Sequence, residues 1–265
     1  MTIRARPLHV SLPASAPRHW YGGHAFESHF FNALSSLLPE GERFIMQATR
    51  HFADRLVHKH QQEELAGFIA QEGNHSKNHE LHIQQLLAQG YSGLTPMNRF
   101  FRSIMRTYLH YTPRYSLAVA AAVEHITTTL AHTLTSEPDR WLAPMSDEMR
   151  TFWHWHAIEE LEHKAVTYDL YTAIQGDYPL RMLASLQVLV GFSADVFVRH
   201  CYLLAKDDAL FDLGEWRRGT SFLLGREGLL RNMFSELRRY LRRDFHPDQI
   251  DDQALIDQFD RTHAL

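Results

Sequence analysis

The sequence predicts an all-α protein whose centre is a bundle of four long helices, with additional helices before and after it. Apolar residues recur at helical spacing through most of the 265 residues, and no segment alternates convincingly as a β-strand. A second observation is a weak internal repeat. A lone glutamate on one predicted helix is followed by Glu-x-x-His on the next, and this pattern occurs twice.

Helix start and stop signals divide the central part of the chain. Pro39 is suited to the first position of a helix, and Gly90 to the position just after one. Ser146 is suited to the N-cap of a helix that ends at Gly176. The bundle helices are therefore expected at about 39–58, 61–89, 114–135 and 147–175.

The remaining segments are expected to lie around this bundle. Residues 1–25 are predicted to form an N-terminal arm and 26–265 a single helical domain, with the bundle at about 39–176 and accessory helices at about 178–262. Residues 91–112 are expected to be a long connection. The other helices are predicted at 26–37, 178–206, 215–243 and 251–262.

Composition excludes several classes of protein. With 27 basic and 31 acidic residues, no general field is available to attract nucleic acid. Cys201 is the single cysteine, so neither a disulfide framework nor a cysteine-ligated metal site is expected. Residues 182–198 are apolar, but they are fewer than the roughly 20 needed to span a membrane and include Asp195. We expect a cytoplasmic protein without a transmembrane span, in which 178–206 is a buried or partner-covered helix.

The repeated motif places acidic residues on apolar helix faces. At about 100° per residue, Glu72, His75 and His79 share one sector with Leu65 and Phe68. A buried carboxylate costs several kcal/mol unless it is paired, protonated or bound to a metal ion. Some compensating group must therefore lie beside Glu72.

The other three predicted bundle helices also carry acidic residues on their apolar faces. His156, Glu160 and His163 share a face with Trp153, whereas Glu162 points away from it. Glu124 lies on an alanine-rich face and Glu42 on the face of Ile45. The sequence therefore predicts a site for two metal ions with these ligands: Glu42, Glu72, His75, Glu124, His156, Glu160 and His163.

This ligand pattern is that of the ferritin-like bundles that bind two iron or manganese ions through carboxylates. We expect Glu72 and Glu160 to bridge the ions, with Glu42 and Glu124 as terminal ligands. His79 is an alternative to His156 as the additional ligand, and Glu159 or Glu162 are candidate acceptors for histidine N–H groups. Oxygen-rich ligands favour two iron ions, with manganese acceptable and zinc less favoured.

Five motifs resemble those of a bacterial family called predicted metal-dependent hydrolases: PEGERF (39–44), QEGNHSKNH (71–79), AAVEH (121–125), WHAIEELEHKAV (155–166) and DFHP (244–247). The resemblance covers nearly the whole chain. It implies a ferritin-like fold and metal binding by the seven residues named above. The element His-x-x-x-Glu-x-x-His at 156–163 is also similar to the fourth helix of ferritin-like arylamine N-oxygenases, where an additional histidine binds the di-iron centre.

Three functions are compatible with such a site. The leading hypothesis is a non-haem di-iron oxidase or oxygenase that activates O₂ to oxidise a small organic substrate. The alternative is a hydrolase that uses a water molecule activated by two metal ions. A non-enzymatic metal-storage or metal-sensing protein ranks last. For partners we expect a small-molecule substrate, an electron donor if O₂ is reduced, and no nucleic acid; a homo-oligomer is compatible with the sequence.

Overall fold

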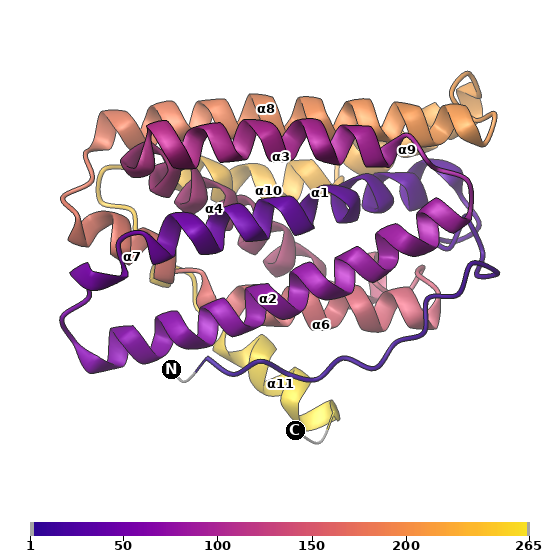
Figure 1. The fold of residues 1–265 in the computed structure, drawn as a ribbon. Helices are drawn as coiled ribbons and strands as arrows, with labels where there is room; N and C mark the ends of the chain where they lie inside the picture. The colour runs from indigo at the N-terminus through magenta and orange to yellow at the C-terminus, as the bar shows by residue number, and fades with distance from the viewer. Residues whose placement is uncertain (1–2, 264–265) are drawn as a thin grey trace.

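The protein is entirely helical over the residues that its structure, a computed structural model, describes. These are residues 3–263, and they contain no β-strand, only one isolated bridge between Tyr21 and Met145. Figure 1 shows long helices lying side by side along one general direction, with shorter helices around them. The predicted all-α fold is therefore confirmed.

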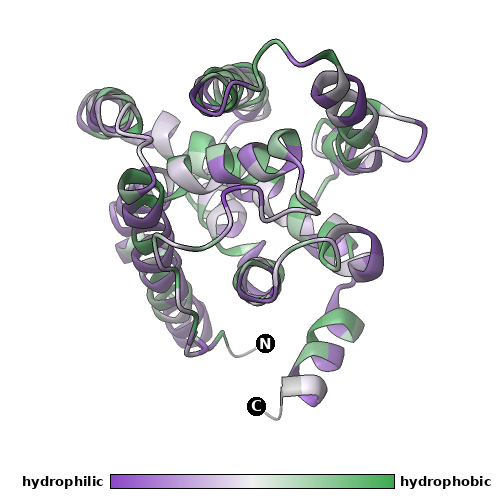
Figure 2. Ribbon diagram, turned by 90° about the vertical axis from the view of Figure 1, so that its right-hand side faces the viewer, coloured by the Kyte–Doolittle hydropathy of each residue, from purple (hydrophilic) through white to green (hydrophobic). Residues whose placement is uncertain are grey.

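Four long helices form the interior of the molecule: α1 (Ala25–Arg50), α2 (Lys59–Ala88), α4 (Pro113–Ser136) and α6 (Asp147–His163). Helix α1 packs against α2 and α4, and α4 packs against α6. Two further long helices, α3 (Leu94–Tyr111) and α8 (Tyr178–Lys206), cover α1 and α4. Figure 2 shows several helices end-on, each carrying both hydrophilic and hydrophobic turns, as expected for helices with one face in a core.

The predicted break at Pro39 is wrong, because α1 continues through this residue. Every residue from 25 to 40 is buried, so this half of α1 is surrounded by protein on all sides. Packing supports the backbone on both sides of the proline. The Arg199 guanidinium donates to the Ser36 carbonyl at 3.5 Å, and the Ser76 hydroxyl donates to the Pro39 carbonyl at 3.2 Å. Tertiary contacts here outweigh the cost of proline in a helix interior.

Three other expectations about the elements need correction. The segment expected as a connection at 91–112 is mostly α3, in which only Leu94 is buried. The predicted helix 147–175 is two helices, because α6 ends at His163 and α7 (Val166–Ala173) follows. The predicted helix 215–243 is also two, α9 (Leu213–Leu224) and α10 (Leu229–Arg239), separated by a turn that contains Gly225 and Gly228.

The helix predicted at 39–58 ends earlier than expected, because α1 stops at Arg50. The remaining elements lie close to their predicted positions. Helix α8 spans the predicted 178–206, and α11 (Gln253–His263) lies where a short helix was expected. The short helices η1 (Ala53–Arg55), α5 (Pro138–Trp141) and η2 (Pro247–Gln249) were not predicted.

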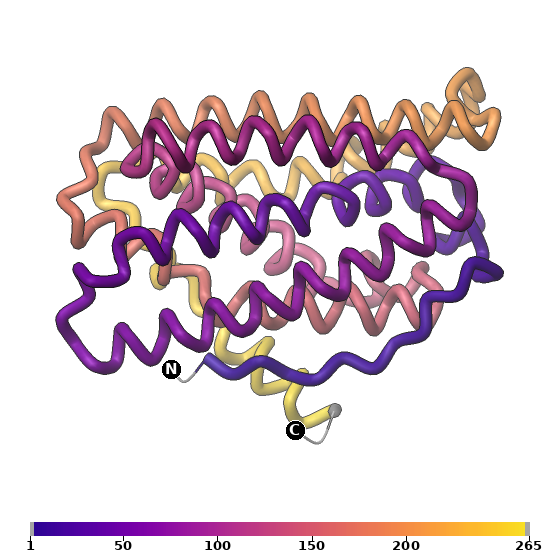
Figure 3. The backbone as a smooth tube through the Cα atoms, in the orientation of Figure 1, coloured from indigo at the N-terminus to yellow at the C-terminus, as the bar shows by residue number. Residues whose placement is uncertain are grey.

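The segment before α1 runs along the bundle rather than away from it, as the chain trace in Figure 3 shows. Gln71 of α2 donates to the Arg4 carbonyl at 3.0 Å, and Gln85 of the same helix donates to the Pro13 carbonyl at 3.0 Å. On the other side, the Trp155 indole of α6 donates to the Arg6 carbonyl at 3.2 Å. This segment therefore covers the groove between α2 and α6.

Helix α8 is covered on one face only. It is long and apolar enough to cross a membrane by length and composition, and 33% of its most apolar stretch is buried. The helix, which we expected to be buried or partner-covered, is therefore buried on one face and exposed on the other. Within that face, Arg199 is fully buried and pairs with Asp195 at 2.6 Å. Leu183, Leu186 and Val190 lie on the exposed face.

Candidate metal centre

The two Glu-x-x-His motifs meet in the interior between α2 and α6. Glu72, His75, Glu160 and His163 are all buried, and each offers one ligand atom within 4.8 Å of the others. His163 Nε2 lies 3.3 Å from Glu72 Oε1, and His75 Nδ1 lies 3.6 Å from an oxygen of both Glu72 and Glu160. The i, i+3 spacing places each glutamate and histidine on one helix face.

A second group lies directly beside the first. Glu42 of α1, His79 of α2 and His156 of α6 are buried, and each offers one ligand atom within 4.8 Å of the others. Glu160 joins the two groups, because its Oε1 lies 3.1 Å from His156 Nε2. The structure therefore places both His79 and His156 beside Glu42, with His79 Nε2 at 2.9 Å from His156 Nδ1.

Two further glutamates contact the outer nitrogens of the histidines. Glu159 Oε2 lies 3.0 Å from His75 Nε2, and Glu124 Oε2 lies 3.2 Å from His163 Nδ1. These contacts leave His75 Nδ1 and His163 Nε2 facing the first group. Such carboxylate partners fix the ring orientation and tautomer of a metal-binding histidine. Glu159 has the position expected of such a partner, whereas Glu124 lies outside both groups and contacts His163.

The buried carboxylates of the site lack lysine and arginine partners. Among residues 3–263, no lysine or arginine forms an ion pair with Glu42, Glu72, Glu124 or Glu160, and the ion-pair contacts of the last three are with histidines. Other buried carboxylates do have arginine partners: Glu162 pairs with Arg6 at 2.6 Å and Glu40 pairs with Arg102. A set of buried carboxylates without lysine or arginine is unfavourable unless protons or metal ions neutralise it.

The close packing of buried acids and histidines shifts the pKa values of the site residues. Burial and the neighbouring charge of Glu72 raise the pKa of Glu42 well above its ordinary value. Burial raises the pKa of Glu124 to about 8, against the attraction of His163. For Glu160, burial is outweighed by His163 and His156, which lower its pKa to about 2. Burial disfavours the charged form of His163, but Glu124 and Glu160 outweigh it and raise its pKa to about 9.

The unpaired atoms of the site fit metal ions. Both carboxylate oxygens of Glu42 and of Glu72 are buried without a hydrogen-bond partner, as are His75 Nδ1 and His163 Nε2. Buried polar atoms without hydrogen-bond partners are rare in proteins, and a bound ion is one explanation for them. The two histidines are partnered on their outer nitrogens and unpartnered on their inner ones, which is the arrangement that a metal ligand requires.

Two residues that the sequence analysis did not single out hold the site in place. The Ser35 hydroxyl lies 2.7 Å from His79 Nδ1, and the Thr127 hydroxyl donates to Glu160 Oε2 at 2.7 Å. Ser35 lies two helical turns before Glu42, and Thr127 one turn after Glu124, so helical spacing alone marks both as neighbours of the site. The expected break at Pro39 separated Ser35 from Glu42.

We predict that replacement of Glu159 by glutamine weakens metal binding about 10- to 100-fold, because His75 loses the carboxylate that orients its ring. Competition with a chromophoric chelator measures this change. Glu162→Gln is the matched control, since Glu162 lies on the same helix but pairs with Arg6. Equal metal affinity in both variants would show that Glu159 does not position His75.

The comparisons with known proteins identify a family. The model of the family described as predicted metal-dependent hydrolase matches residues 4–251. No curated protein and no solved structure matches the chain. The match includes every residue expected in or around the site and nearly all of the helical domain, so this chain belongs to the family of predicted metal-dependent hydrolases.

Proposed function

We propose that this protein is a hydrolase that depends on two divalent metal ions held between α1, α2, α4 and α6. Glu72, His75, Glu160 and His163 would hold one ion, and Glu42, His79 and His156 the other, with Glu160 between them. The observation that carries the proposal is the set of buried atoms without partners on Glu42, Glu72, His75 and His163. Membership of the family supports hydrolysis as the reaction.

A pair of divalent ions bound here would lower the pKa of a water molecule and polarise a carbonyl or phosphoryl oxygen of the substrate. The protein residues position this chemistry. Glu159 orients His75, Glu124 orients His163, and Thr127 orients Glu160. The seven predicted ligands, His79 and Glu159 are all at most 4% exposed, so the site is shielded from bulk water. We propose a small organic molecule as the substrate.

A second candidate is a di-iron oxidase or oxygenase that uses O₂. The observation that favours it is the donor set, in which four glutamates and several histidines from four helices converge, as in carboxylate-bridged iron and manganese bundles. Oxygen-rich ligands favour iron or manganese over zinc. This candidate needs an electron donor as a partner, whereas hydrolysis needs only water.

Metal-free protein reconstituted separately with iron, manganese or zinc under argon tests the two candidates. A panel of p-nitrophenyl acyl esters and phosphate esters measures hydrolysis, and an oxygen electrode measures O₂ consumption. We expect hydrolysis that requires metal and has the same rate with and without air. Turnover that occurs only with iron and only with O₂ would reject the hydrolase in favour of the oxidase. Binding of many more than about two ions per chain would favour storage.

A further inference from the structure

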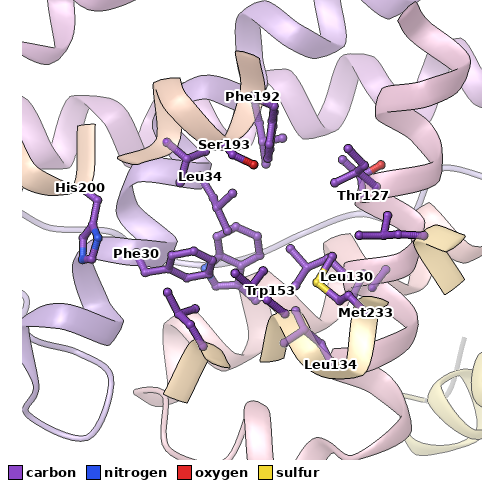
Figure 4. Close-up of a pocket in the computed structure, with 18 of the residues that line it drawn as sticks. Phe30, Leu34, Thr127, Leu130, Leu134, Trp153, Phe192, Ser193, His200 and Met233 are labelled. Carbon is purple, nitrogen blue, oxygen red and sulfur yellow. The ribbon is translucent and has the colours of Figure 1, made fainter. Parts of the chain in front are cut away.

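An apolar cavity extends from the metal centre towards the surface of the molecule. It has a volume of about 230 Å³, and Figure 4 shows its lining residues converging from α1, α4, α6, α8 and α10. The lining is almost entirely hydrocarbon, with Phe30, Leu34, Leu134, Phe192 and Met233 among its members. A cavity of this kind favours an uncharged, apolar ligand.

One end of the cavity touches the proposed catalytic site. His156 and Thr127 both line it, and both are bound to Glu160, through His156 Nε2 at 3.1 Å and the Thr127 hydroxyl at 2.7 Å. A ligand in the cavity therefore lies next to the residues that hold Glu160. No lysine or arginine lines the cavity, so a charged chain end is not stabilised inside it.

The other end of the cavity opens between α8 and α10. Leu189 and Phe197 of α8 line the cavity and are 49% and 54% exposed, and Leu230 of α10 is 38% exposed. Ser193 also lines it from an exposed position on α8. An apolar molecule can therefore enter from outside without unfolding the bundle.

We propose that this cavity binds the acyl chain of the substrate, so that the protein hydrolyses esters or amides of medium-chain carboxylic acids. The proposal rests on the proposed hydrolase function. In the reaction the oxygen of water bonds to the acyl carbon, the bond from that carbon to the alcohol oxygen or amine nitrogen breaks, and the leaving group takes up a proton. The acyl chain lies in the cavity and its carbonyl end lies at the Thr127 and His156 side.

The size of the cavity limits the ligand to a single chain. An engineered cavity of about 150 Å³ accommodates benzene, and pockets for drug-sized ligands span roughly 300–1,000 Å³. At about 230 Å³ the cavity falls between these values. One alkyl chain of moderate length fits this volume better than a two-chain lipid or a polycyclic ligand.

Binding of 1-octanol, an uncharged molecule with one chain of moderate length, to the metal-free protein is measured by isothermal titration calorimetry and tests the cavity without any need for activity. Ser193→Trp places a large side chain at the cavity, and Ala194→Trp is the matched control on the next residue of α8, which is exposed but does not line the cavity. We expect Ser193→Trp to weaken binding at least tenfold and Ala194→Trp to bind as the wild type does. Because both positions are exposed, both variants should fold, and Ser193→Leu provides a milder block of the same opening.

Hydrolysis of p-nitrophenyl acetate, butyrate and octanoate by the metal-loaded protein then tests the acyl chain as substrate. We expect kcat/KM to rise by up to about fourfold per methylene group, and this rise to be lost in Ser193→Trp. Equal 1-octanol binding by both tryptophan variants would overturn the cavity proposal. Binding of 1-octanol without ester hydrolysis would reject the hydrolase but keep the cavity as an apolar site. Hydrolysis that is independent of chain length and of Ser193→Trp would keep the hydrolase and overturn the cavity.

Discussion

Replacement of Glu72 or Glu160 by alanine is expected to remove bound metal from this protein. These two glutamates belong to the group in which His75 and His163 present their unpartnered nitrogens. Loss of a residue that merely orients a ligand lowers metal affinity about 10- to 100-fold, and loss of a shared ligand should exceed that. Metal content after gel filtration, measured by inductively coupled plasma mass spectrometry, should fall from about two ions per chain to near zero.

Glu162→Ala is the control for this experiment, because Glu162 is on the same helix as Glu160 but faces the N-terminal segment. It pairs with Arg6 at 2.6 Å and accepts a hydrogen bond from Gln71 at 2.6 Å. Arg6 also contacts Asp260, so the segment keeps one of its anchors in this variant. We expect Glu162→Ala to retain full metal content. Full metal occupancy in both Glu72→Ala and Glu160→Ala would refute the site.

Removal of metal is expected to lower the thermal stability of the wild-type protein. Metal that binds only the folded chain stabilises it by about 4 kcal/mol when its free concentration is about 1,000 times Kd. For a chain of this length, about 1 kcal/mol shifts Tm by roughly 2–4 °C. Chelation should therefore lower Tm by about 10 °C, as measured by differential scanning calorimetry before and after dialysis against EDTA.

The Glu72→Leu variant separates stabilisation by bound metal from the stability of the metal-free fold. Its Tm should not respond to metal, and its metal-free form should be at least as stable as the metal-free wild type. The reason is that Glu72 is 1% exposed and both of its carboxylate oxygens lack hydrogen-bond partners, so leucine removes an unfavourable buried group. An EDTA-induced shift of the same size in Glu72→Leu would show that the stabilising metal binds elsewhere.

Helical spacing alone was enough to predict the centre of this site. Glu72 with His75 and Glu160 with His163 recur at i, i+3 on apolar faces, and the side-chain period of a helix fixes which residues share a face. These four side chains therefore come together once α2 and α6 pack with these faces inward. The same periodicity predicted α2, α4 and α8 to within a few residues.

The sequence did not show that one helix continues through a proline and that another ends without a helix-breaking residue. Pro39 indicates a helix start, but Arg199 and Ser76 support the carbonyls around it, and both come from distant parts of the chain. Conversely, nothing between His163 and Val166 resembles a breaker. There Lys164 contacts the Ile250 carbonyl and pairs with Asp252 at 2.6 Å, a contact that accompanies the end of α6.

What the sequence by itself determined is the all-α class, the four helix faces that carry the acidic residues, and the identity of those residues. These follow from local periodicity, which is encoded within each helix. Only the tertiary structure decided that His79 and His156 both lie beside Glu42, that Glu124 and Glu159 contact the outer nitrogens of histidines, and that an apolar cavity reaches Thr127. Those features depend on the rotation and spacing of helices relative to one another, which long-range packing sets.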